Sequence, residues 1–203
     1  MSFAEEVIVP FRVPRDQVPM GTHFKSTWLS ASLDIMRERR LMEPYLEKLP
    51  KQFHEPILHS IAGVWLPAEV IVEHYRACDQ LGLSLPEQIA GGKAIMNRLQ
   101  KTIFSMGFRA AREAGVTPFS VLKQLPANWD REWKGGGVGI FKIGPKDARV
   151  EMVGFAGAAI PYCRNGLRGV VMGLCELVCT KAYAQEIREL CTPTSVGFRV
   201  AWA

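Results

Sequence analysis

The sequence predicts an α+β fold in which N-terminal helices are followed by an antiparallel sheet built as β-β-α-β-β. Up to about residue 134, apolar side chains recur at spacings of three and four, which is typical of amphipathic helices. After the run Gly135-Gly136-Gly137, apolar residues instead alternate with polar ones, as in half-buried strands. No linker or internal repeat divides the chain, so we expect a single domain over residues 1–203, mainly helical over 1–134 and with a sheet plus a central helix over 135–203.

Composition and charge exclude several classes of protein. A chain of 203 residues that is 48% hydrophobic can bury a core of its own. The net charge is +5, but the basic residues are dispersed, so nucleic acid is not an expected partner. The five cysteines show no disulfide spacing and no signal peptide is visible, so we expect a cytoplasmic protein with reduced thiols. Arg164 and Arg168 interrupt the most apolar stretch, which argues against a membrane span.

The N-terminal part opens with an extended arm. Residues 7–9 are β-branched and lie among prolines, which suits an edge strand better than the centre of a sheet. The periodicity and the cap residues then predict helices at 26–41, 44–48, 55–61, 68–80, 86–114 and 118–125, with a loop at 128–134.

The longest of these helices, from Pro86 to Ala114, is apolar on two sides and must therefore be buried on two sides. One side can meet the domain core, and the other can meet a second copy of the chain. This pattern predicts a homodimer through the helix; the alternative is that both sides are internal to one chain. The two stripes are Ile89, Gly92, Met96, Leu99, Ile103, Met106 and Ala110, and Ile95, Phe104, Phe108 and Ala111.

The C-terminal part places a helix between two hairpins. Strands are expected at 138–143 and 148–155, joined by the turn residues 144–147. The central helix runs over 161–178, and further strands are expected at 183–190 and 198–202.

Three glycines mark one face of the central helix. Gly166, Gly169 and Gly173 share an apolar side at the helical repeat of about 100° per residue. Each costs about 1 kcal/mol in a helix interior relative to alanine. Packing must offset this cost, so we expect a close approach here of a sheet, another helix or a ligand.

A candidate pocket adjoins this face. Tyr162, Arg164 and Arg168 lie in the first turns of the helix, where the dipole and free N–H groups favour an anion. An amphipathic ligand would place an acidic head there and an apolar tail along the glycines; alternatively, the arginines are solvated or pair with Glu151 or Glu186. The predicted ligand-binding residues are Tyr162, Arg164, Gly166, Arg168, Gly169 and Gly173.

Other patterns favour structural roles. Residues 135–139 are glycine-rich but open a strand, whereas a phosphate-binding loop opens a helix. Cys175 and Cys179 lie one turn apart without a flanking His, so we expect buried thiols rather than a zinc site. His74 and Cys78 share a helix face, which could activate a thiol, but nothing nearby supplies an oxyanion hole. We therefore expect no catalytic residue, no metal and no cofactor.

The central helix resembles that of a known ligand-binding superfamily. Residues 163–174, CRNGLRGVVMGL, are similar to the glycine-bearing helix shared by haem–nitric-oxide sensors, vinyl-reductase-type small-ligand domains and the Bet-three subunits of the TRAPP tethering complex. The resemblance implies an α/β fold, dimerisation through N-terminal helices and a pocket for a small or fatty ligand. The closing strands look like the vinyl-reductase type at Glu186 or Glu189, at Cys191 and at Phe198-Arg199-Val200.

The chain departs from the haem-binding members of this superfamily. Their Tyr-x-Ser-x-Arg haem contact is absent, since Tyr162 is followed by Cys163-Arg164-Asn165. His54 and His59 would face different ways on a helix, so neither is expected to bind haem. The whole chain, including Trp65-Leu66-Pro67 and the ending Val200-Ala201-Trp202, is also similar to a myxobacterial family of uncharacterised proteins.

The leading hypothesis is a non-enzymatic, dimeric signalling domain that binds a small apolar or acyl ligand. Its basis is the glycine face of the central helix. The alternative is a protein-interaction module with a filled core, in which the glycines only permit tight packing. A thiol enzyme acting through Cys78 is a third interpretation.

Overall fold

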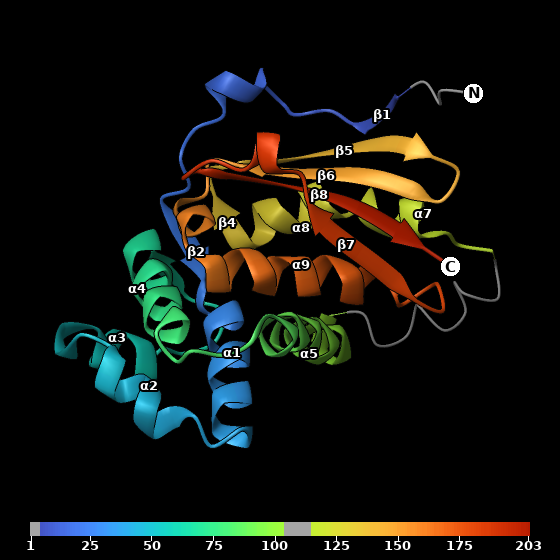
Figure 1. The fold of residues 1–203 in the computed structure, drawn as a ribbon. Coiled ribbons are helices and arrows are strands. Elements are labelled where there is room, and N and C mark those ends of the chain that lie inside the picture. The colour runs from blue at the N-terminus through green and yellow to red at the C-terminus, as the bar shows by residue number, and fades with distance from the viewer. Residues whose placement is uncertain (1–4, 104–114) are drawn as a thin grey trace.

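The computed structural model describes residues 5–103 and 115–203, with side chains described only up to residue 99 in the first range. A five-stranded sheet forms one layer and the helices lie beneath it (Figure 1). The strands are β1 (Glu6–Val9), β5 (Gly137–Gly144), β6 (Asp147–Val153), β7 (Ala182–Glu186) and β8 (Ser195–Trp202). Their order is β1-β5-β6-β8-β7, and every neighbouring pair is antiparallel. The predicted α+β class and β-β-α-β-β order are confirmed.

The helices are α1 (Ser26–Glu38), α2 (Met42–Lys48), α3 (His54–Leu58), α4 (Ala68–Asp79), α5 (Leu85–Ile103), α7 (Pro118–Leu122), α8 (Leu125–Glu132) and α9 (Pro161–Cys175). Helix α9 crosses the underside of the sheet, and α5 packs along it on the far side (Figure 1). Short 3-10 turns lie at η1 (Arg15–Gln17), η2 (Lys51–Phe53), η3 (Ala156–Ala159) and η4 (Arg188–Leu190). None of the helices in the described ranges is long and apolar enough to cross a membrane.

Three elements differ from the sequence-based expectation. Residues 128–134 are not a loop, because α8 continues to Glu132 and is followed by the strand β4 (Trp133–Lys134). Trp65-Leu66-Pro67 comes directly before α4 and forms β3 (Trp65–Pro67), a strand that was not predicted. It joins β2 (His23–Lys25) and β4 in a second, small sheet. Strand β7 ends at Glu186 instead of continuing to residue 190, where η4 turns the chain. Strands of two or three residues are too short to show an alternating pattern.

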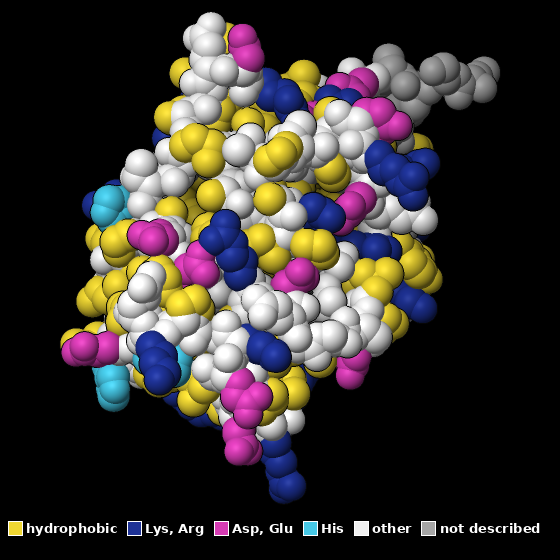
Figure 2. All heavy atoms as spheres, turned by 60° about the vertical axis from the view of Figure 1, so that its left-hand side comes forward, with side chains coloured by type: hydrophobic (Ala, Val, Ile, Leu, Met, Phe, Trp, Pro, Cys, Tyr) yellow, Lys and Arg dark blue, Asp and Glu magenta, His cyan; other side chains and the backbone are white. Residues whose placement is uncertain are grey.

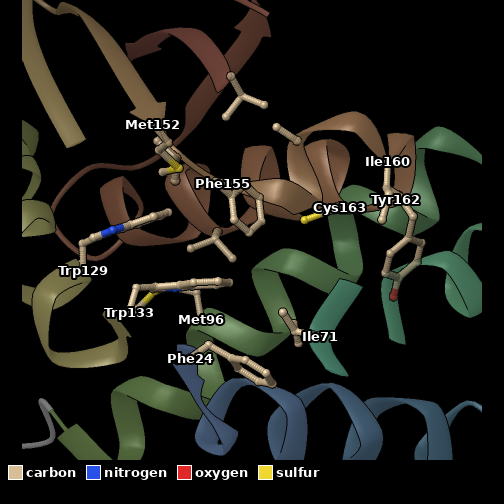
Figure 3. Close-up of a cluster of buried hydrophobic side chains, with 14 of the residues drawn as sticks. Phe24, Ile71, Met96, Trp129, Trp133, Met152, Phe155, Ile160, Tyr162 and Cys163 are labelled. Carbon is tan, nitrogen blue, oxygen red and sulfur yellow. The ribbon is translucent and has the colours of Figure 1, made fainter. Parts of the chain in front are cut away.

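Aromatic rings join the two sheets into one core (Figure 3). Trp129 stacks on Trp133 with ring centroids 5.3 Å apart, and Phe155 meets Trp133 edge-on at 5.0 Å. Phe24 of β2 is fully buried against Trp133. Such tilted and stacked pairs add about 0.5–1.5 kcal/mol each beyond the area they bury. These rings therefore connect β2 and β4 of the small sheet to α8 and to the segment that follows β6.

Charged side chains are interspersed on the outer surface. On the face drawn in Figure 2, Lys and Arg alternate with acidic and apolar side chains instead of gathering in one patch. The net charge of +5 is thus not concentrated in one patch on this face.

Candidate functional site

The glycine face of α9 is covered by α5. A Cβ atom built on Gly169 would lie 2.1 Å from Ile89 O, and one on Gly92 of α5 would lie 1.9 Å from Gly166 O. Gly173 meets the side chain of Met96, whose Cβ would be 3.2 Å away. Backbone therefore touches backbone between the two helices, which only glycine allows. The sequence left three possible neighbours for this face: a sheet, another helix or a ligand. The structure shows that the neighbour is helix α5, which contacts Gly169 and Gly173.

An internal carboxylate occupies the start of α9. The backbone N–H of Tyr162 donates to Asp79 Oδ1 at 2.8 Å, at the point where α4 ends. An anion was expected at this helix terminus, and the chain supplies one itself. The Tyr162 ring points away from the Cys163 sulfur (Figure 3), its centroid lies 6.4 Å from that of the Tyr75 ring of α4, and the residue is only 8% exposed. Burial raises the pKa of Tyr162 well above its usual value, so its hydroxyl stays neutral.

Arg164 and Arg168 face a different space from the glycines. They line a surface hollow of about 540 Å³ together with Arg188 and Glu186, between α9, β7 and η4. Arg164 Nη1 donates to Ala158 O at 3.0 Å, and its Nε lies 3.4 Å from Glu186 Oε1. The Nε atoms of Arg164 and Arg168 are both buried and have no hydrogen-bond partner among the described residues. Glu186 therefore pairs with Arg164, which was one of the alternatives that the sequence left open.

Two apolar cavities lie along α9 beyond the glycine contact. The larger has a volume of about 70 Å³ and lies between α1, α5, α8 and α9. The smaller, of about 20 Å³, is bordered by Tyr162 and Gly166 on α9 and by Tyr75 on α4. Trp28 of α1 and Val170 of α9 line both. The six residues predicted for one pocket are thus divided: two line the small cavity, two pack on α5 and two line the outer hollow.

Glu132 is among the residues that line the larger cavity. Its Oε2 is buried and has no hydrogen-bond partner within the described structure. Burial raises the pKa of Glu132, opposed by nearby Lys25 and by a hydrogen bond from the Trp28 side chain. The rest of the wall is mainly apolar, from Met96, Leu99 and Leu174 among others. Sequence reasoning missed Trp28 and Glu132, because they lie far apart in the chain and neither belongs to a motif.

His74 and Cys78 meet in the core and not at a cleft. His74 is fully buried, with Nδ1 2.8 Å from Tyr45 Oη and Nε2 2.9 Å from Ser32 Oγ. Burial lowers the pKa of His74 to about 3 and raises that of the Cys78 thiol. A neutral imidazole with both nitrogens engaged cannot activate a neutral, buried thiol. The pair therefore has a structural role.

Comparison with family models and with curated proteins finds no sequence match. Comparison of structures finds the same fold in H-NOX domains. The Fe(II) unliganded H-NOX protein from K. algicida superposes with a TM-score of 0.64 and 8% identity over 88% of this chain and 96% of that one. A point mutant of the T. tengcongensis H-NOX gives 0.59 and 11% over 88% and 97%. An oxygen-binding H-NOX domain related to soluble guanylate cyclases gives 0.56 and 10% over 87% and 92%.

These likenesses define the chain as a protein with an H-NOX-like fold. The agreement extends over nearly the full length of both chains at identities of 8–11%. A structural match at such low sequence identity establishes the fold alone. Function depends on the residues of the site.

Proposed function

We propose that this protein is a non-enzymatic signalling domain that binds a small, largely apolar molecule beside Trp28, between α1, α5, α8 and α9. The observation that carries the proposal is the apolar cavity of about 70 Å³ along α9, which is lined in part by Glu132. The buried Oε2 atom of Glu132 has no hydrogen-bond partner among the residues that the structure describes. A mainly apolar cavity of this kind can accept small apolar molecules. The shared fold with H-NOX domains, which include haem and oxygen binders, supports a sensing role.

Haem does not fit the part of this chain that the structure describes. A haem needs an axial ligand such as His, Cys, Met or Tyr at the wall of a large, dry pocket. Tyr162 and Met96 are possible ligands of this kind, but the cavities that they line have volumes of only about 20 and 70 Å³, too small for a haem. His59 borders a hollow of about 520 Å³, but this hollow lies on the surface beside Ile61, which is 75% exposed. His74, in turn, has both ring nitrogens engaged.

An acyl chain is excluded from the glycine face for a related reason. Helix α5 occupies the surface of Gly169 and Gly173 along which a tail was expected to lie. The ligand is therefore compact: a few heavy atoms with an apolar body and one O–H or N–H group that donates to Glu132 Oε2. That hydrogen bond would supply the partner that the buried oxygen lacks.

A titration followed by nuclear magnetic resonance tests this proposal. We expect 2-methylpropan-1-ol to shift the Trp28 indole and Val170 methyl signals with a dissociation constant of about 1 mM, as suits a ligand of about five heavy atoms. Leu174→Phe should fill the cavity and abolish the shifts. Trp28→Ala should open a passage between the two cavities and admit the larger molecule indole. An absence of saturable shifts in the native protein would overturn the proposal.

Arg164 and Arg168 support a second candidate, a site for a small anion in the outer hollow. Their two buried Nε groups lack hydrogen-bond partners in the described part of the chain, and three arginines there face one acid, Glu186. An anion would satisfy these donors. We expect inorganic phosphate to raise the melting temperature of the native protein and not that of Arg168→Gln, with Lys146→Gln as a matched control. Equal responses of all three proteins would exclude the site.

The interaction-module alternative depends on the doubly apolar helix from Pro86 to Ala114. In the range 85–99, α5 packs against α9 on one side and α1 on another, so its two apolar faces are both internal there. Met106, Ala110 and most of the second stripe lie outside the described residues. Dimerisation through the helix from Pro86 to Ala114 remains a prediction, which sedimentation equilibrium of the whole chain tests.

A further inference from the structure

The N-terminal arm is pinned to the sheet at several points. After β1 it passes over β5 and descends at the end of the sheet toward β2 (Figure 1). Phe11 seats against β5, where a Cβ on Gly139 would lie 2.8 Å from the Phe11 ring. Farther along, Gly136 N donates to Pro19 O at 2.8 Å, and Gly136 has a φ of 69°, which favours glycine. The glycine-rich run 135–139 therefore packs directly against the arm.

An ion pair holds the middle of the arm. Arg15 Nε donates to Glu151 Oε2 at 2.9 Å, and Glu151 is 3% exposed on the outer face of β6. Arg12 of the arm forms an exposed ion pair with Asp130 of α8. The arm is therefore fixed at its ends and centre and arches over the surface between them.

A hollow of about 540 Å³ lies beneath this arch. Its size falls within the range of about 300–1,000 Å³ that is usual for small-molecule sites. Trp129 and Phe11 give it aromatic walls, and Val13 and Val18 add apolar surface. Trp129 Nε1 donates to Gly135 O at 3.0 Å and the ring stacks on Trp133, so this wall is rigid. A preformed aromatic wall lowers the entropic cost of binding a flat ligand.

The charged side chains at the rim of the hollow favour a ligand of one sign of charge. Arg12, Lys123 and Asp130 line the hollow, and Arg12 is neutralised by Asp130. Lys123 is exposed and has no ion pair among the described residues. The rim therefore carries one uncompensated positive charge above aromatic walls.

We propose that the hollow beneath the arm is a second binding site, which takes a small aromatic carboxylate. The aromatic ring lies against Trp129 and Phe11, and the carboxylate pairs with Lys123. This site shares no lining residue with the cavity beside Trp28 or with the arginine hollow. It stands independently of the function proposed above.

Calorimetry of the whole chain with a matched pair of probes tests the site. Phenylacetate and phenethylamine have the same ring and opposite charges, and we expect phenylacetate to bind at least tenfold more tightly. Ala127→Trp places a large ring in the hollow from an exposed position and should abolish the binding of phenylacetate. Lys123→Glu should weaken it roughly fivefold, the upper range for an exposed ion pair.

Lys146→Glu is the control, because it makes the same charge change on the exposed turn between β5 and β6. It should leave phenylacetate binding unchanged. The site is refuted if phenylacetate does not bind, if both amine and acid bind equally, or if Ala127→Trp, folded by circular dichroism, binds phenylacetate as the native protein does.

Discussion

Replacing Gly169 by alanine places a methyl group against the backbone of α5. Its Cβ would lie 2.1 Å from Ile89 O and 3.0 Å from Lys93 N, so no side-chain rotation relieves the contact. Overpacking costs about 1–3 kcal/mol, and a backbone clash belongs at the upper end. Alanine returns about 1 kcal/mol of helix propensity. We therefore expect a net loss of about 2 kcal/mol in the free energy of unfolding, seen as a fall of about 4–8 °C in melting temperature.

Gly166→Ala is the matched control on the same helix. Its Cβ meets nothing within 4 Å, so only the propensity gain of about 1 kcal/mol remains, and the melting temperature should rise by about 2–4 °C. Gly92→Ala, whose Cβ would lie 1.9 Å from Gly166 O, should behave like Gly169→Ala. Calorimetric melting curves of the three variants measure these shifts in melting temperature. If Gly169→Ala and Gly166→Ala both stabilise the protein, α5 does not sit on the glycine face.

Three further changes test other contacts. Glu151→Ala should cost about 2–3 kcal/mol in urea unfolding, because it leaves Arg15 and Arg149 beside an empty buried position; a loss under about 0.5 kcal/mol would show that the arm is not held there. Because the pKa of His74 is lowered to about 3, only the unfolded state binds its proton below about pH 6.5, so stability should fall by about 2 kcal/mol from pH 7 to 5. His74→Gln should flatten that pH profile, and an unchanged slope would contradict the burial. Asp79→Ala should cost about 1 kcal/mol by uncapping α9, and no change in melting temperature would argue against the cap.

The sequence predicted the large sheet and the helix beneath it because these elements are long. Within β8, large apolar residues alternate with smaller or charged ones over 198–202, and α9 carries its glycines on one face over 15 residues, so each pattern repeats often enough to be recognised. The first three residues of β8, 195–197, are all buried and do not alternate, so the predicted strand began too late. The small sheet was missed because β2, β3 and β4 have two or three residues each. Their pairing depends on contacts between residues far apart in the chain, which no local pattern records.

The candidate site was harder to predict than the fold. The cost of three glycines in a helix indicated a close neighbour at Gly166, Gly169 and Gly173, and the structure places one at Gly169 and Gly173, whereas a Cβ on Gly166 would meet nothing within 4 Å. Periodicity could not say whether that neighbour was a ligand or a helix. A useful signal was Gly92 in the interior of the helix from Pro86 to Ala114, since small residues on two helices allow their backbones to touch. Nothing local indicated that Trp28 and Glu132 would share a cavity wall.

A crystal structure determined under xenon pressure tests the central claim most directly. We expect α5 in backbone contact with α9 at Gly92 and Gly169, and a xenon atom between Trp28, Met96 and Leu174. Xenon should disappear from this position in Leu174→Phe. A cavity without xenon in the native protein, or a haem held between these helices, would contradict the account.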